Sequence, residues 1–202
     1  MAGSGNKKSS GGAGIKVLII GVVLIGLVVG YYYYLSNKKG KDDTEENVKA
    51  TAVQEVILYN FERNYPQLPK EVVKLYGKFT QCFYNEEYTE EELRQMAMQI
   101  QKLYDDELIA NKTENQYIED LKWDINMFKE KGTNISSYAV ASGADVDYFT
   151  QDGFDFAKLH CRFTLRTGTQ LSYSDEIFLL RKDSDGHWKI YGWTLADEEN
   201  AG

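Results

Sequence analysis

Cysteine, histidine and proline each occur only twice in this chain of 202 residues, and the scarcity of each excludes a class of protein or site. The two cysteines, Cys82 and Cys161, allow one disulfide at most, so the fold is not a scaffold built on disulfides. Both occupy apolar positions of a periodic pattern, which predicts buried free thiols. A bridge stays open as the alternative if the two are adjacent in an extracytoplasmic domain.

Sequence signatures of catalysis and metal binding are also absent. The chain contains no Cys-x-x-Cys, His-Glu-x-x-His, Gly-x-Ser-x-Gly or glycine-rich phosphate loop. Of the two histidines, His160 lies among cations that do not suit an acid catalyst, and His187 follows the glycine of a turn. We therefore predict no catalytic residue, no cofactor and no bound metal, with an enzyme as the minority interpretation.

Acidic residues are missing from the first 41 positions, where six lysines occur. The rest of the chain holds all 31 acids against the remaining 17 lysines and arginines, a net charge of −14. A domain with this charge repels phosphate backbones. We therefore expect no nucleic acid among its partners.

Residues 17–35 are uncharged and almost wholly apolar. As an α-helix this run would be about 28 Å long, close to the thickness of the hydrocarbon core of a bilayer. It ends in the bulky residues 31–35 rather than in a small-residue cleavage site, and tyrosine suits the membrane interface. We therefore predict an uncleaved signal-anchor, a transmembrane helix over residues 15–36 that contacts the lipid bilayer through residues 17–35.

Lysines flank this run on both sides, so charge alone does not set its orientation. A short tail of polar residues and glycines, residues 1–14, precedes the run, and a long acidic region follows it. This order favours a disordered cytoplasmic tail, a single pass through the cell membrane and an extracytoplasmic C-terminal domain.

The only prolines, Pro66 and Pro69, mark the predicted start of the folded domain. Before them, apolar residues recur at helical spacing, which predicts a juxtamembrane linker and stalk helix within residues 37–65. A helix packed on the domain would show the same pattern. We expect the domain itself at residues 66–196 and a disordered tail at residues 197–202.

Three helices with clear start and stop signals are expected after the prolines. The first should run to about residue 88, the second to about residue 108 and the third to about residue 132. A proline in a first turn, two capping boxes and a terminal glycine are typical of helix ends. In chain order these signals are Pro69, Thr89 with Glu92, Thr113 with Gln116, and Gly132.

Beyond residue 132 the apolar period changes to two, which is the period of half-buried strands. The predicted turn at residues 183–186 ends in Asp-Gly, whereas a calcium loop would need a glutamate where Gly192 stands. Helices followed by meandering strands predict an α+β fold, with three helices packed on a four-stranded antiparallel sheet. The strands are expected at residues 137–149, with a bulge at Gly143, and at 156–167, 170–182 and 187–195.

This order, together with the ending at residues 181–193, a charged turn, Asp-Gly and then Trp-x-Ile, resembles the NTF2-like (cystatin-like cone) superfamily. The resemblance covers residues 66–195 and implies a curved sheet wrapped on a long helix, with a pocket at the open end. With an anchor in front, the chain looks like the uncharacterised single-pass membrane proteins of Gram-positive bacteria that carry such a domain. It is more distantly similar to the VirB8-type subunits of conjugation machinery. The superfamily includes isomerases, dehydratases, adaptors and assembly subunits, so the resemblance implies no activity.

A basic strip stands out in this acidic domain. Lys158, His160, Arg162 and Arg166 share one face of a predicted strand and form the candidate binding surface. One interpretation is a self-association surface that pairs with acidic helices such as residues 90–92. The other is ordinary surface charge that keeps the sheet from aggregating.

Isomerases of the superfamily use a carboxylate and a tyrosine hydroxyl inside the cone. Asp145, Asp147, Tyr173 and Asp175 lie on predicted strands and would be the source of such groups here. Exposed acids on a sheet face are the ordinary explanation for the same residues.

The sequence thus favours a non-enzymatic, membrane-anchored extracytoplasmic domain that serves as a binding or assembly module, with a homo-oligomer or an envelope protein as its partner. A small-molecule-binding or isomerase-like domain that uses the cone pocket is the alternative. A subunit of a conjugation or secretion complex is a further one. The first predicts association through the sheet, and the second predicts a closed apolar pocket with inward Asp and Tyr.

Overall fold

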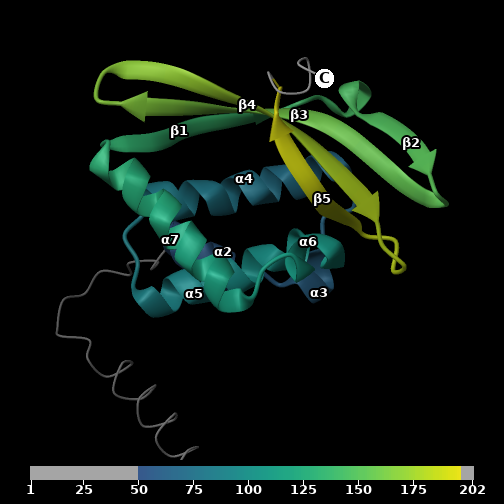
Figure 1. Cartoon of the computed structure of the whole chain (residues 1–202), viewed down its shortest axis with the longest axis horizontal. Coiled ribbons are helices and arrows are strands. Elements are labelled where there is room, and N and C mark those ends of the chain that lie inside the picture. The colour runs from purple at the N-terminus through teal and green to yellow at the C-terminus, as the bar shows by residue number, and fades with distance from the viewer. Residues whose placement is uncertain (1–49, 197–202) are drawn as a thin grey trace, which may run out of the picture. The chain divides into compact units, whose positions relative to one another are not determined.

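Strands follow helices along the chain, in the order predicted from the change of period (Figure 1). The computed structural model describes residues 50–196. The predicted terminal tails, transmembrane helix and juxtamembrane linker lie outside the described residues. From residue 50 to residue 196, no helix is long and apolar enough to cross a membrane. The helices are α2 (Ala52–Ile57), α3 (Phe61–Asn64), α4 (Pro69–Asn85), α5 (Glu90–Ile100), the 3-10 turn η1 (Gln101–Leu103), α6 (Asp106–Ala110) and α7 (Glu114–Glu130).

The sheet is antiparallel throughout, in the order β1-β3-β4-β5, with β2 also paired to β3. Four strands were predicted, but the first predicted strand is divided into two separate strands. Residues 141–146 leave the edge of β3 and include the 3-10 turn η2 (Gly143–Asp145), so the bulge expected at Gly143 is a longer interruption. The strands are β1 (Thr133–Val140), β2 (Asp147–Gln151), β3 (Phe154–Thr167), β4 (Gln170–Lys182) and β5 (Trp188–Leu195).

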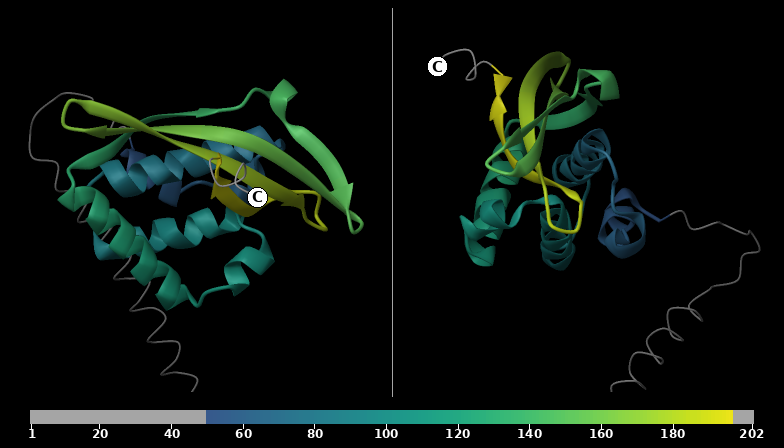
Figure 2. Two further views of the ribbon diagram at one scale, coloured as in Figure 1. Left: turned by 45° about the horizontal axis from the view of Figure 1, so that its top comes forward. Right: turned by 90° about the vertical axis from the view of Figure 1, so that its right-hand side faces the viewer.

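The helices cover one face of this curved sheet, with α4 next to the strands and α5 and α7 beyond it (Figures 1 and 2). The period-two pattern puts Ala157, Leu159, Cys161 and Phe163 of β3 on the inner face, and all four are buried. They pack in one core with the apolar side of α4, which includes the fully buried Phe79. The predicted α+β architecture is therefore confirmed, and it is consistent with an NTF2-like cone.

The helix ends and the turn predicted from local sequence signals are confirmed. Both capping boxes form, and the helix from Glu114 to Glu130 is followed by Gly132 at a φ of +60°. Gly186 of the tight turn before β5 has a φ of +83°, a conformation in which a side chain would clash. Cys82 and Cys161 are buried free thiols, as expected, and burial raises the pKa of Cys82 to about 11.

The predicted stalk helix is part of the folded domain instead. Its residues form the two short helices α2 and α3, whose Val53 and Val56 are buried in the core. The hydroxyl of Tyr65, just after α3, donates to the carbonyl oxygen of Trp188 in β5 at 2.9 Å. The alternative, a helix packed on the domain, is therefore correct, and the domain begins before Pro66.

The second predicted helix, at residues 89–108, is broken. Its chain turns away after η1, where Tyr104 pairs with Ile190 of β5 and the backbone N–H of Asp105 donates to the Ile190 carbonyl at 2.9 Å. The Asp105 carboxylate then caps the start of α6 by accepting the N–H of Glu107. This cap is the local signal for the break that the apolar spacing concealed.

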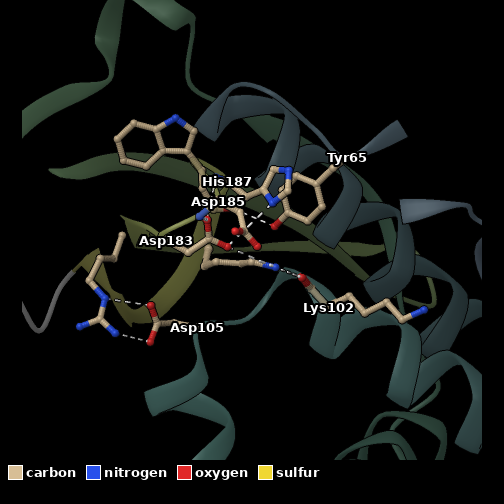
Figure 3. Close-up of polar contacts among 9 residues, drawn as sticks. Tyr65, Lys102, Asp105, Asp183, Asp185 and His187 are labelled. Carbon is tan, nitrogen blue, oxygen red and sulfur yellow. Dashed lines mark hydrogen bonds and ion pairs between the residues drawn. The ribbon is translucent and has the colours of Figure 1, made fainter. Parts of the chain in front are cut away.

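Asp105 also ties α6 to the sheet through Arg181 of β4 (Figure 3). Two guanidinium nitrogens of Arg181 donate to the Asp105 carboxylate at 2.9 and 2.6 Å, and a third donates to Glu107 at 2.7 Å. The Arg181 guanidinium lies over the rings of Phe154 and Tyr191. Asp105 is only 4% exposed, so this is a buried ion pair at the joint between helices and sheet.

Gly77, in the middle of α4, allows the sheet to approach the helix. A Cβ at this position would lie 2.6 Å from the ring of Tyr138, whose hydroxyl donates to the Lys74 carbonyl. Replacing an interior helical glycine by alanine ordinarily stabilises a helix by about 1 kcal/mol. Here we expect Gly77→Ala to lower the free energy of unfolding by about 1 to 3 kcal/mol, because the ring must move.

Urea unfolding monitored by circular dichroism measures this change. In a Tyr138→Ala background, the same Gly77→Ala substitution is expected to be neutral or stabilising, because the ring is gone. A Gly77→Ala variant at least as stable as the parent chain would contradict the close approach.

Candidate functional site

A cavity of about 480 Å³ lies between the inner face of the sheet and the helices α4 and α7. Most of its lining is aromatic or aliphatic, and about a third of the lining residues are polar or charged. The aromatic residues of the lining are Tyr76, Phe83, Tyr84, Tyr104, Tyr117, Phe128, Phe163 and Trp193.

The one carboxyl that the sheet contributes to the cavity belongs to Glu176 of β4. Alternation along β4 puts Glu176 on the same face as the fully buried Phe178. Its Oε1 accepts a long hydrogen bond from the Ser174 hydroxyl at 3.4 Å. Its Oε2 is shielded from solvent and has no hydrogen-bond partner among the described residues.

Burial raises the pKa of Glu176 to about 7. A carboxylate oxygen that is buried without a partner costs free energy, and the group responds by holding its proton. Near neutral pH, Glu176 is therefore balanced between its neutral and its charged form.

Three aromatic rings line the cavity together with this carboxyl. Tyr76 of α4, Tyr104 of the η1 end and Trp193 of β5 form an aromatic triad with ring centroids 5.6 to 6.4 Å apart. Burial raises the pKa of both tyrosines well above the usual value, so their hydroxyls stay neutral donors. The triad thus contributes aromatic rings and neutral hydroxyl groups to the lining of the cavity.

Two further carboxyls line the cavity from α7. Asp120 forms a 2.6 Å salt bridge with Lys112, which is the only basic residue of the lining in the part of the chain that the structure describes. Burial and the nearby Asp120 raise the pKa of Asp124 above its ordinary value. The charged groups around the cavity are therefore mainly acidic.

The acids and the tyrosine named from the sequence lie elsewhere. The carboxylate of Asp175 accepts two hydrogen bonds from the Arg162 guanidinium, at 2.6 and 3.0 Å, on the outer face of the sheet. Tyr173 lies beside the same guanidinium and is exposed. Asp145 accepts from Ser142 in the η2 turn, and Asp147 is exposed on β2. None of the four lines the cavity.

Glu176 was missed although a signal for it was present. It follows Asp175 directly and precedes Phe178 by two positions, so the β4 alternation places it on the apolar face. Five of the aromatic lining residues, Tyr76, Phe83, Tyr104, Tyr117 and Phe128, are visible in the sequence only as members of helical apolar stripes.

The basic strip lies on the outer face of β3, as its alternation predicts. His160, Arg162 and Arg166 are exposed and Lys158 is half-buried. Arg162 is already paired with Asp175, so the strip is not uniformly cationic. The acidic residues suggested as its counterpart are also engaged, because Glu90 pairs with Lys122 and Glu92 belongs to a capping box. A role for the strip in self-association stays a prediction.

The turn before β5 has the contacts of a structural turn (Figure 3). Asp183 accepts the backbone N–H groups of Asp185 and His187 at 2.9 and 2.8 Å. Its second oxygen lies 4.0 Å from the Lys189 ammonium, which itself donates to the Lys102 carbonyl at 2.7 Å. Asp183, Asp185 and His187 lie close enough to share a cation, but one Asp183 oxygen already accepts two backbone N–H groups of the turn.

One similar solved structure is the crystal structure of CagV, a VirB8 homolog of T4SS from Helicobacter pylori strain 26695. It is 12% identical, with a TM-score of 0.38, and the match covers 62% of this chain and 96% of that chain. No curated protein matches the sequence. A family model described as "Domain of unknown function (DUF6715)" matches residues 5–193. The chain therefore belongs to the DUF6715 family.

Proposed function

We propose that the domain binds a small, largely apolar molecule in the cavity between the sheet and helices α4 and α7. The observation that carries this proposal is the buried, unpartnered Oε2 of Glu176 within an aromatic lining. A binding site is typically a mostly apolar cavity of a few hundred Å³ with a few convergent polar groups. The volume of about 480 Å³ falls within that range.

The place of action in this proposal comes from the sequence. An uncharged run at residues 17–35 would tether the domain to a bilayer, and the acidic region that follows would lie outside the cytoplasm. The protein is then a membrane-anchored binding module, in which the cavity rather than the outer face of the sheet carries recognition.

An isomerase-like activity is the second candidate, and one observation favours it. A carboxyl with a pKa of about 7 is suited to move a proton at neutral pH, and Glu176 has such a pKa beside tyrosine hydroxyls. Binding is preferred because it needs only the cavity, whereas turnover also needs a second group to receive the proton.

The binding proposal can be tested by filling the cavity. Tryptophol, a neutral and water-soluble indole alcohol, is titrated into the full chain in detergent by isothermal titration calorimetry. We expect saturable binding with one site per chain. Ser174→Phe places a ring beside Glu176 and is expected to weaken this binding at least tenfold.

Ser172→Phe is the matched control, because Ser172 lies two residues earlier on β4 and does not line the cavity. It should leave tryptophol binding within about twofold of the parent chain. Equal loss in both variants, or no saturable binding in the parent chain, would overturn the proposal.

A further inference from the structure

The charges around the cavity are unbalanced in favour of carboxyls. Among residues 50–196, its lining contains Glu176, Asp120 and Asp124 but only one cation, Lys112. Lys112 is held by Asp120 at 2.6 Å and is thus not available to Glu176 as a dedicated partner. A cation that enters this cavity would meet favourable charges, whereas an anion would meet repulsion. The acidic excess of the chain after residue 41 acts in the same direction.

Glu176 supplies a specific acceptor for such a cation. Its Oε2 is shielded from solvent and accepts no hydrogen bond among the described residues, and the only bond to its Oε1 is the 3.4 Å contact from Ser174. A ligand N–H⁺ that contacts Glu176 from the cavity would give its carboxylate a charge-assisted hydrogen bond, which is stronger than one from a neutral donor. The group that the site lacks is therefore a donor with positive charge.

The aromatic triad provides the surroundings that an ammonium prefers. Tyr76, Tyr104 and Trp193 lie within 6.4 Å of one another, centroid to centroid. Aromatic faces attract ammonium groups through the ring quadrupole, and the attraction grows where water is excluded. A carboxylate beside several aromatic faces is a combination that recognises a cation with an apolar body.

We propose that the cavity is selective for amines, with the ligand ammonium bound by Glu176 and the aromatic triad and the apolar body lying against the remaining lining. This inference rests on the proposed binding function and names its ligand class. It excludes carboxylates and phosphates as preferred ligands of the cavity.

Amine binding is coupled to a proton. An ammonium favours the charged carboxylate, so below pH 7 its binding must release the proton that Glu176 holds. The other groups facing Glu176 are neutral or lie farther along the lining. Burial raises the pKa of Tyr76, Tyr84 and Tyr117, and that of Cys161 on the neighbouring strand to about 12, while Asp124, Asp120 and Lys112 complete the charged lining.

Three probes that share an indole body test the selectivity. Tryptamine is a cation, tryptophol is neutral and indole-3-acetate is an anion, and each is titrated into the full chain in detergent. At pH 8 we expect tryptamine to bind at least tenfold more tightly than tryptophol and indole-3-acetate to bind most weakly. Between pH 5.5 and pH 8 the affinity for tryptamine should rise about 30-fold, as expected for a carboxyl that ionises near pH 7.

Two variants separate the cavity from the overall charge. Glu176→Gln, nearly isosteric, is expected to reduce the preference for tryptamine over tryptophol to threefold or less and to abolish its pH dependence. Asp175→Asn removes the same charge one residue away, on the outer face, and should retain both. Thermal unfolding of each variant confirms that it is folded.

The outcomes distinguish this inference from the function on which it rests. Tryptophol binding that equals or exceeds tryptamine binding at pH 8 would overturn amine selectivity and leave the binding module intact. The same follows if Asp175→Asn loses the preference as fully as Glu176→Gln does. Failure of all three probes to bind would overturn both proposals.

Discussion

Replacing Arg181 by methionine is expected to lower the free energy of unfolding by about 3 to 5 kcal/mol, which is the usual cost of leaving a buried charge without its partner. Asp105 is 4% exposed and receives two hydrogen bonds from the Arg181 guanidinium. Methionine keeps much of the apolar volume of the arginine side chain but supplies no donor. Chemical unfolding in urea at pH 7 measures the loss.

Two further variants show whether burial of the Asp105 carboxylate is the reason for this large loss of stability. Arg162→Met breaks an ion pair with Asp175 whose side chains are 58% and 42% exposed, and it should cost less than about 1 kcal/mol. The double variant Asp105→Asn with Arg181→Met removes both charges and keeps a good helix cap, so it should recover much of the stability. Equal losses from Arg181→Met and Arg162→Met would show that the Asp105 pair is not effectively buried.

Raising the pH from 5 to 8 is expected to destabilise the domain through Glu176 by up to about 3 kcal/mol. Its pKa in the folded chain is about 7, above the value near 4.5 of an unfolded chain. The folded state therefore holds the proton more tightly, and the stability that the proton contributes is lost as the pH rises through 7. Carboxyls with a lowered pKa, such as Asp175, change stability below pH 4.5 and so do not interfere.

The measurement is urea unfolding at half-unit steps of pH. The free energy of unfolding of Glu176→Gln should stay constant between pH 5 and 8. At pH 8 this variant should be more stable than the parent chain, because its amide carries no charge to bury. In Asp175→Asn, Glu176 is unchanged, so the free energy of unfolding should depend on pH as it does in the parent chain. A parent chain that gains stability over this range, or a Glu176→Gln variant that keeps the slope, would contradict the burial of Glu176.

Much of the fold was predictable because its signals are local. A capping box such as Thr89 with Glu92, or a turn glycine such as Gly186, acts within a few residues and is visible in the sequence. The change of apolar period located the sheet for the same reason. The two errors in the helical part depend on distant partners. Val56 is buried by the core and Asp105 is held by Ile190 and Arg181, which lie far along the chain.

The candidate site was harder to predict than the fold. Arg162 and Asp175 are candidates from the sequence because they are charged residues on strands with alternating apolar positions. In the structure they form an ion pair with each other on the outer face of the sheet. Glu176 lies one position after Asp175, and alternation along β4 assigns it to the face of Phe178, but the sequence does not show that a cavity lies against that face. A cavity forms between several helices and strands, so the sequence of any one segment does not predict it.

The hydrogen bond from Tyr65 to Trp188 affects how the chain folds while it is being synthesised. It joins positions 123 residues apart, at the two ends of the folded domain. During synthesis Tyr65 leaves the ribosome well before Trp188, so this hydrogen bond can form only once the last hairpin has been made. The link between the segment after α3 and β5 is therefore completed only when nearly the whole domain has been synthesised.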